Sequence, residues 1–298
     1  MRTTNRLIES SEYVHFRSSV PLRNICVDNS KGESWKVYDA GPKIIRSPVI
    51  FLPPTCGTAD IYFRQLVYLS SIGYRAIAVE SPCSYWTVNE WCLGFKLLLD
   101  HLRLEKVHLF GASLGGFLAQ KFVEFTYQCP RVISLFLCNT FIDTEIFDLT
   151  ETSSLFWLLP TVFLKRLIMP SLITKSFDPD IIAAVDFVSE RVKSLTQADF
   201  ASRLTINCSA SRVHIENMRG VRAITIMDVF DEYALSSPIR EEIYELYPYA
   251  KLAQLKNGGN FPYLSKFEEV NIHINIHLRK FETETCSPRL IQTEAVHD

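Results

Sequence analysis

The sequence predicts an α/β fold in which a central, mostly parallel sheet is flanked by helices. Three observations predict it. Short β-rich runs alternate with segments of helical apolar spacing over most of the 298 residues. Val132–Cys138 is apolar without a break, as expected for a strand buried on both faces. The alternation stops between residues 141 and 220 and then resumes, which indicates an insertion into one domain.

The elements before the insertion begin with three strands. Val20–Asp28 and Ser34–Ala40 are separated by the turn-forming Asn29–Gly32, so we expect a hairpin. Pro48–Leu52 ends at two prolines, which have no N–H group to donate to a sheet. The elements that follow are a helix at Asp60–Ser71, a strand at Tyr74–Val79, a helix at Val88–Leu102, a strand at Lys106–Phe110, a helix at Leu114–Tyr127 and the strand Val132–Cys138.

After the insertion the same rhythm returns. We expect a strand at Ala223–Met227, a helix at Ser237–Tyr247, a strand at Ala250–Leu255, and the last helix within Phe261–Phe281.

The domain organisation follows from these elements. Residues 16–140 and 221–281 are expected to form the core, and residues 141–220 are expected to form a cap inserted into it. The polar residues 1–15 are expected to be a flexible segment, and the polar residues 282–298 a disordered tail.

The composition excludes several classes of protein. The chain is 47% hydrophobic and 21% charged with a net charge of −2, and it has no basic stripe, so nucleic acid is not expected as a partner. We find no secretory signal, and no apolar run approaches the about 18 residues of a membrane span. Cys92, Cys138 and Cys208 lie in apolar runs, which favours buried reduced thiols and a cytosolic location. No cofactor or metal motif is found, and none is expected to bind.

Gly111-Ala112-Ser113-Leu114-Gly115 (the elbow) has the pattern of a nucleophile elbow. A strand end precedes it and a helix start follows it, as the motif requires. Its two glycines are needed because a Cβ atom would clash in so tight a turn. Ser113 is expected to project over the sheet, with the Leu114 N–H as one oxyanion donor. The elbow therefore predicts the α/β-hydrolase fold.

The second oxyanion donor is altered in this chain. Active members of the fold commonly have His-Gly and a donor residue after the third strand, whereas this chain has Pro53-Pro54-Thr55. The prolines offer no N–H group, and Thr55 keeps one. Thr55 is therefore the second candidate donor.

The remaining triad positions are one acid and one histidine, in that order along the chain. The acid position after the strand that follows the insertion is held by Asp231, with Asp228 as a weaker candidate. Where many α/β-hydrolases have Gly-Gly-His-x-Pro, this chain has Asn260 in the histidine position. An amide cannot take a proton from serine near neutral pH. The sequence thus predicts a presented nucleophile, a candidate acid and no general base.

The chain has other histidines that could replace the missing base. His214, at the end of the cap, is the best candidate because a cap can fold back over Ser113. His108 is expected to face the core or a helix from within its strand. His273 and His277 lie one turn apart, and a surface helix face is favoured over a metal pair because no carboxylate motif accompanies them.

These motifs resemble the maspardin family of α/β-hydrolase-fold proteins. The resemblance extends from about residue 20 to 280, through the segments 38–42, 50–54, 57–60, 108–122, 201–208, 225–231 and 258–264. It implies a cytosolic protein, partly associated with endosomal or trans-Golgi membranes, with a non-catalytic binding or trafficking role. It also implies protein partners such as the cytoplasmic tail of a T-cell co-receptor and an aldehyde dehydrogenase homologue.

Leu155–Ile168 in the cap is the most apolar stretch of the chain. It is too short to span a bilayer, and Lys165 and Arg166 flank its aromatic and aliphatic residues. This pattern suits a membrane surface or a partner groove. A cap helix packed on the fold, or a cap over a small pocket beside Ser113, would have the same pattern.

Three functions compete on the sequence alone. The first is a non-catalytic binding protein, which Asn260 favours. The second is a serine esterase or lipase with an atypical triad that uses Ser113, Asp231 and His214. The third is a sensor that binds a small acyl or carboxylate compound without turnover.

Overall fold

The central sheet confirms the predicted fold class. The computed structural model describes residues 6–28, 33–147, 155–173, 176–218, 220–231 and 237–281. Its strands are β1 (Arg23–Asp28), β2 (Glu33–Ala40), β3 (Val49–Leu52), β4 (Ala76–Glu80), β5 (Val107–Ala112), β6 (Val132–Cys138), β7 (Ala223–Val229) and β8 (Lys251–Leu255). They form one sheet in the order β1-β2-β4-β3-β5-β6-β7-β8. The β1–β2 hairpin is antiparallel as predicted, β2 is antiparallel to β4, and the remaining pairs are parallel.

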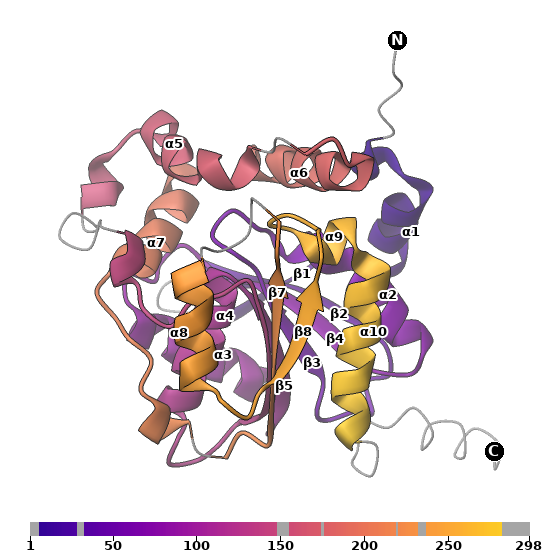
Figure 1. The fold of residues 1–298 in the computed structure, drawn as a ribbon, viewed down its shortest axis with the longest axis vertical. Coiled ribbons are helices and arrows are strands. Elements are labelled where there is room, and N and C mark those ends of the chain that lie inside the picture. Colours follow the sequence, from indigo (N-terminus) through magenta and orange to yellow (C-terminus); the bar gives the residue numbers. More distant parts are fainter. Residues whose placement is uncertain are drawn as a thin grey trace.

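Helices cover both faces of this sheet because its centre is apolar on both sides. Every residue of β3, β4, β5 and β6 is buried, which confirms the prediction for Val132–Cys138. One face is covered by α3 (Val88–His101), α4 (Leu114–Phe125) and α8 (Ser237–Leu246), and the other by α2 (Phe63–Ser71) and α10 (Phe267–Leu278) (Figure 1). Phe95 and Phe122 pack into the core on the first face, and Phe63 and Ile274 on the second.

The N-terminal segment is helical in part, whereas residues 1–15 are predicted from the sequence to be flexible. A short 3-10 turn at Leu7–Glu9 leads into α1 (Ser11–Ser19), which Ser10 caps by accepting a hydrogen bond from the Tyr13 N–H. Tyr13 and Phe16 are buried, and their rings lie 5.2 and 5.9 Å from the Phe63 ring. Two aromatic anchors in a polar helix produce little periodicity, so sequence spacing does not reveal them. Residues 1–5 and the predicted tail at 282–298 lie outside the described residues.

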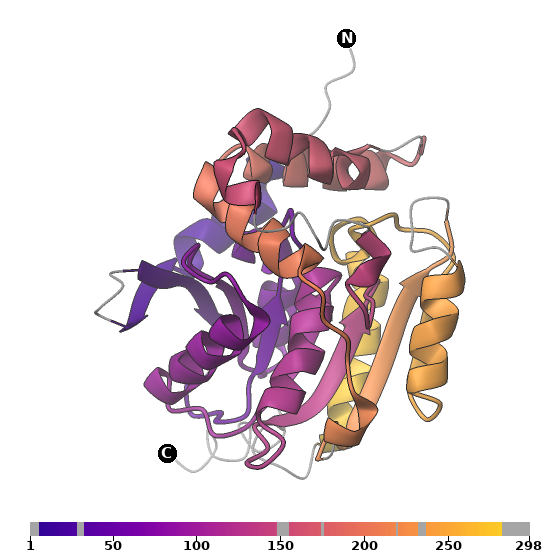
Figure 2. The same ribbon diagram turned by 90° about the vertical axis from the view of Figure 1, so that its left-hand side faces the viewer.

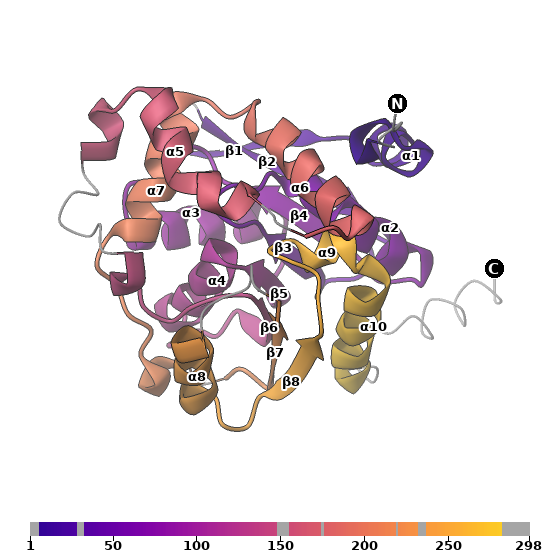
Figure 3. The ribbon, with the colours of Figure 1, turned by 45° about the horizontal axis from the view of Figure 1, so that its top comes forward.

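Three helices of the cap lie between β6 and β7 in the chain. They are α5 (Thr161–Leu172), α6 (Pro179–Val192) and α7 (Gln197–Cys208). Figures 1 and 2 show α5 and α6 as a layer across the end of the sheet toward which the arrows of β7 and β8 point. With that end tilted toward the viewer, α6 crosses in front of the sheet near β4 and β3, and α5 and α7 lie beside it (Figure 3). The cap is therefore placed over the elbow, which follows β5.

Two further expectations concern membranes and cysteines. Within the described part of the chain, no helix is both long enough and apolar enough to cross a membrane. Cys92, Cys138 and Cys208 are free and buried, as expected for reduced thiols.

Candidate active site

The elbow has the strained geometry that its glycines predict. Ser113 links β5 to α4 with φ 48° and ψ −118°, a backbone conformation that residues other than glycine rarely adopt. Its N–H donates to the Cys138 carbonyl at 3.0 Å, and its own carbonyl accepts a 2.6 Å bond from the Thr140 hydroxyl. A Cβ atom on Gly115 would collide with the Leu52 carbonyl, and one on Gly111 would collide with the backbone of Gly115. The backbone therefore determines the position of Ser113, independently of the side chains around it.

Asp231 holds the loop that follows β8. Its Oδ2 accepts hydrogen bonds from the N–H groups of Gly258 at 3.0 Å and Gly259 at 2.6 Å. These two glycines come directly before Asn260, so the structure brings the acid position beside the histidine position. The carboxylate therefore has backbone amides as partners where a hydrolase would offer it an imidazole.

Asp228, the weaker acid candidate, does not take part in the site. It is buried and accepts a 2.6 Å hydrogen bond from the Tyr244 hydroxyl of α8. Burial raises the pKa of its carboxyl group. Asp231 is therefore the residue that the structure supports at the acid position.

Ser113, Thr55 and Asn260 line one pocket of about 220 Å³ beneath the cap. The other lining residues come from the loops after β3, β6 and β8, from the cap and from a short 3-10 turn, and they are Pro54, Cys56, Asn139, Phe141, Phe147, Leu167, Ile168, Ser171, Leu204, Asn207, Cys208 and Phe261. No histidine is among these described residues. The Asn260 amide donates to the Ser171 carbonyl of α5 at 3.3 Å, which joins the loop after β8 to the cap.

His214 is not the substitute base that the esterase hypothesis requires. Its side chain is 56% exposed and its Nδ1 lies 3.6 Å from a Glu216 carboxylate oxygen. It lines an open depression with Lys121, Asp143 and Arg212, apart from the pocket that contains Ser113. The end of the cap is fixed there because the His214 N–H donates to Glu124 of α4 at 2.5 Å.

The histidines of the sheet and of the last helix also lie elsewhere. His108 is buried, as expected for its strand position. The interpretation of His277 as a surface residue is wrong, since it is 3% exposed and its Nε2 lies 2.7 Å from the Ser134 hydroxyl. Helical spacing does not reveal the burial of His277, because the inner side of α10 contains polar residues as well as apolar ones. Among the described residues, no cluster of three or more metal-ligating side chains is found.

The two oxyanion candidates belong to different elements, Leu114 to the elbow and Thr55 to the loop after β3. Leu114 is the first residue of α4, where a helical N–H has no partner within its own helix. The Thr55 hydroxyl donates to the Asn207 amide oxygen at 3.2 Å, which fixes the loop after β3 against α7. Sequence patterns do not identify Asn207, because a polar residue near a helix end is usually solvent-exposed.

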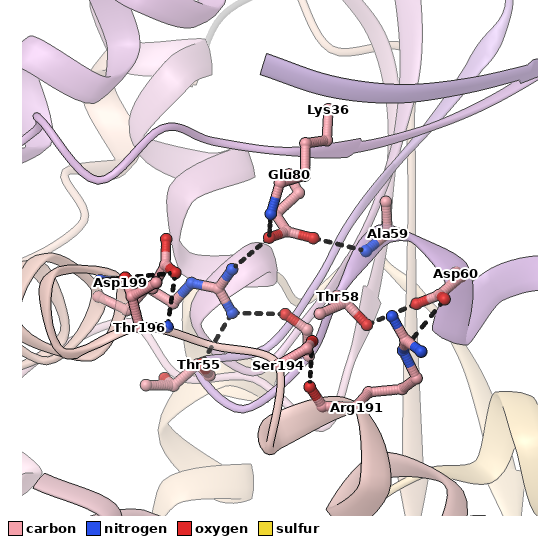
Figure 4. Close-up of polar contacts among 12 residues, drawn as sticks. Lys36, Thr55, Thr58, Ala59, Asp60, Glu80, Arg191, Ser194, Thr196 and Asp199 are labelled. Carbon is pink, nitrogen blue, oxygen red and sulfur yellow. Dashed lines mark hydrogen bonds and ion pairs between the residues drawn. The ribbon is translucent and has the colours of Figure 1, made fainter. Parts of the chain in front are cut away.

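Two buried carboxylates of the core bind arginines of the cap. The Arg203 guanidinium of α7 lies 3.1 Å from Glu80 at the end of β4 and donates to the Gly57 carbonyl at 2.6 Å. Arg191 of α6 lies 3.2 Å from Asp60 (Figure 4). Asp60 also accepts a 2.6 Å hydrogen bond from the Tyr13 hydroxyl of α1. These ion pairs hold the cap closed over the pocket.

Local sequence patterns do not predict these two ion pairs. Each joins positions more than a hundred residues apart, which no local pattern reports. A charged residue on a helix is usually solvated, yet Arg203 is 7% exposed and Asp60 only 2%.

A pair of tryptophans adds an aromatic contact between cap and core. The rings of Trp86, in the loop after β4, and Trp157, in the cap, are stacked with centroids 4.2 Å apart and planes 7° apart. Nearby cap residues are exposed in spite of their apolar character, among them Leu158 (80%), Val162 (64%) and Phe163 (52%). On α5 itself, Leu164 and Ile168 are buried, so this helix packs by one side and presents the other.

Comparisons with known proteins give a consistent result. No model of a protein family matches the chain. The chain is 52% identical over 288 residues to maspardin of Danio rerio, covering 96% of this chain and 92% of the relative. It is 53% identical over 272 residues to maspardin of Homo sapiens, covering 91% and 88%.

Solved structures share the fold at low sequence identity. A carboxylesterase of Nitrososphaera gargenis is 16% identical with a TM-score of 0.67, covering 87% of this chain and 99% of its own. An enol-lactonase of Burkholderia xenovorans is 12% identical with a TM-score of 0.68, covering 83% and 97%. At this identity the likeness shows the α/β-hydrolase fold alone.

Proposed function

Because this chain belongs to the maspardin family, we propose that it is a non-catalytic α/β-hydrolase-fold protein that acts as a protein-binding adaptor or regulator. Its setting would be intracellular trafficking at endosomal or trans-Golgi membranes, or receptor signalling. The observation that supports the proposal most is Asn260 in the histidine position of the pocket that Ser113 lines.

The replacement of a triad histidine is expected to have a large effect on the reaction rate. In a serine hydrolase, removal of the triad histidine reduces the rate by about 10⁶, equivalent to about 8 kcal/mol of barrier. No described imidazole lines the pocket to compensate. The Asp231 carboxylate, which would orient an imidazole, accepts hydrogen bonds from Gly258 and Gly259 instead. Within the described part of the chain, the backbone of a hydrolase site is present and its imidazole is not.

The cap offers a surface suited to partner binding. Val162, Arg166 and Met169 share one side of α5 because they are spaced by four and three residues. Val162 and Met169 are exposed at 64% and 43%, and α5 contains basic residues and no acidic ones. An apolar surface with basic residues suits an acidic, partly apolar peptide, and peripheral contact with an anionic membrane would use the same residues.

The absence of catalysis is tested with a fluorophosphonate probe, which labels an activated serine covalently. We expect the wild-type protein to react no faster than Ser113→Ala, because the hydroxyl has no base. An active carboxylesterase of the same fold serves as the positive control. Strong labelling of the wild type that disappears in Ser113→Ala would refute the proposal.

The adaptor role is tested by the binding of a fluorescent peptide that carries the cytoplasmic tail of a T-cell co-receptor. Phe163→Asp introduces a negative charge on the exposed cap surface, and we expect it to weaken binding at least tenfold. Ile272→Asp is the matched control, because Ile272 is equally exposed (55%) but lies on α10. Equal affinity of both variants and the wild type would exclude the cap as the contact surface.

A further inference from the structure

The pocket beneath the cap is lined by Ser113 of the elbow and by α5, a helix whose other side is exposed. Leu167, Ile168 and Ser171 of α5 line it, whereas Val162 and Phe163 of the same helix are exposed. A molecule in the pocket would therefore touch the inner side of the helix whose outer side we propose as a contact surface.

The walls of the pocket are uncharged. None of the residues that line it is acidic or basic. Burial raises the pKa of Cys56 to about 12 and that of Cys208 to about 11, so both thiols stay protonated at neutral pH. A charged ligand would lose its hydration here without gaining a counter-ion. The pocket therefore disfavours anions and cations, including the carboxylate ligands of the sensor hypothesis.

The elbow offers hydrogen-bond donors beside the pocket. The Ser113 hydroxyl, which lines the pocket, takes part in no hydrogen bond within the described part of the chain, and the N–H of the next residue, Leu114, has no partner within α4. A carbonyl oxygen is the uncharged group that accepts from both. The rest of the wall is mainly apolar, with Phe141, Leu204 and Phe261 among its residues.

We propose that this pocket binds a small uncharged molecule with an apolar body and a carbonyl group, and that its occupancy orders α5. The inference rests on the non-catalytic function proposed above, because only a site without a base would leave an ester ligand intact. Asn260 also lines the pocket, and its hydrogen bond to the Ser171 carbonyl joins the loop after β8 to α5. A ligand that fills the pocket adds contacts to the same stretch of helix.

The test compares three probes with the same alkyl chain and different charge: methyl octanoate, sodium octanoate and octylamine hydrochloride. Thermal unfolding reports binding, and hydrogen–deuterium exchange reports order in α5. At about 100 times its Kd, the ester is expected to raise Tm by about 5 °C. It should slow exchange several-fold in residues 161–172, but not in α3 (Val88–His101). The anion and the cation should do neither, and an equal response to all three would overturn the inference.

Two variants of α5 separate the pocket from the outer surface. Ser171→Phe places an aromatic ring in the pocket, and we expect it to remove the response to the ester. Val162→Phe adds the same ring to the exposed side of the same helix, and the response should persist. An unchanged response in Ser171→Phe would show that the ester binds elsewhere, against the inference.

The same samples distinguish failure of this inference from failure of the proposed function. Octanoate released by the wild type and not by Ser113→Ala would refute the non-catalytic function, and this inference with it. An ester that stays intact and changes neither Tm nor exchange would refute the ligand inference alone.

Discussion

Two serines of this protein have opposite surroundings. Ser113, at the carboxyl end of β5, is half-buried and lines a pocket that contains no described imidazole. Ser134, within β6 and nearer its amino end, is buried between two imidazoles. Its hydroxyl lies 2.7 Å from His108 Nδ1 and 2.7 Å from His277 Nε2, and His277 Nδ1 lies 2.8 Å from the Thr225 hydroxyl.

The difference shows that neither presentation nor an imidazole is enough for nucleophilic chemistry. Ser113 lines an accessible pocket, but no described imidazole lines that pocket with it. Ser134 has two imidazoles, yet it is 1% exposed, so no substrate reaches it. A reactive serine needs access and a base at one place, and this chain has them at opposite ends of the sheet. The geometry of Ser113 is a property of the backbone and its glycines, so it does not depend on a neighbouring histidine.

The largest effect is expected from breaking the elbow itself. Gly115→Ala places a methyl group against the Leu52 carbonyl, so we expect a loss of at least about 3 kcal/mol in the free energy of unfolding, measured in urea. Helix propensity alone predicts the opposite sign, a gain of about 1 kcal/mol. A variant as stable as the wild type would mean that the turn is looser than the structure has it.

The second prediction places an imidazole beside Ser113, which would remove its main difference from Ser134. Asn260→His places a base in the pocket with Ser113, and we expect fluorophosphonate labelling to rise about 10²-fold, the lower end of general-base effects. The rise should vanish in Ser113→Ala/Asn260→His. Labelling that stays at the wild-type level would indicate that Asp231, held by its two glycines, cannot orient the new imidazole.

The buried histidines predict an acid-sensitive stability. Burial, with Arg222 nearby, lowers the pKa of His108 to about 4, and burial, with His108 and two lysines, lowers that of His277 to about 3. Below pH 6.5 the unfolded chain binds protons that these folded imidazoles reject, so stability falls as pH decreases from 6.5 toward 4. Each histidine contributes a loss of about 2 kcal/mol between pH 6.5 and 5.

One variant tests whether the buried histidines cause this loss of stability at acid pH. His277→Gln keeps a neutral hydrogen-bonding side chain beside Ser134, so its urea stability should lose about 2 kcal/mol less than the wild type over the same interval. The same pH dependence in both proteins would show that other groups determine it.

The smallest effect is expected from relaxing the strain at Ser113. Glycine adopts φ 48°, ψ −118° more readily than a residue with a Cβ atom, so Ser113→Gly should stabilise the fold by about 1 kcal/mol relative to Ser113→Ala. The comparison removes the hydroxyl in both variants and isolates the backbone. Equal stabilities would mean that the elbow stores no strain.

The sequence predicts backbone features better than buried polar contacts. The elbow, the hairpin and the apolar Val132–Cys138 follow from local composition, and the structure confirms each. The place of Asn260 follows from its distance after the last strand. Local composition does not report that Arg203 reaches Glu80, or that His277 is buried, because each depends on which elements the tertiary fold brings together.

The Trp86–Trp157 stack has a practical consequence, since it makes the cap optically visible. Two indoles at 4.2 Å and nearly parallel couple electronically, so they give an exciton signature in near-ultraviolet circular dichroism and quench each other's emission. One indole belongs to the core and the other to the cap. Any departure of the cap from the sheet would separate the pair, and the protein would report it through its own light absorption without an attached dye.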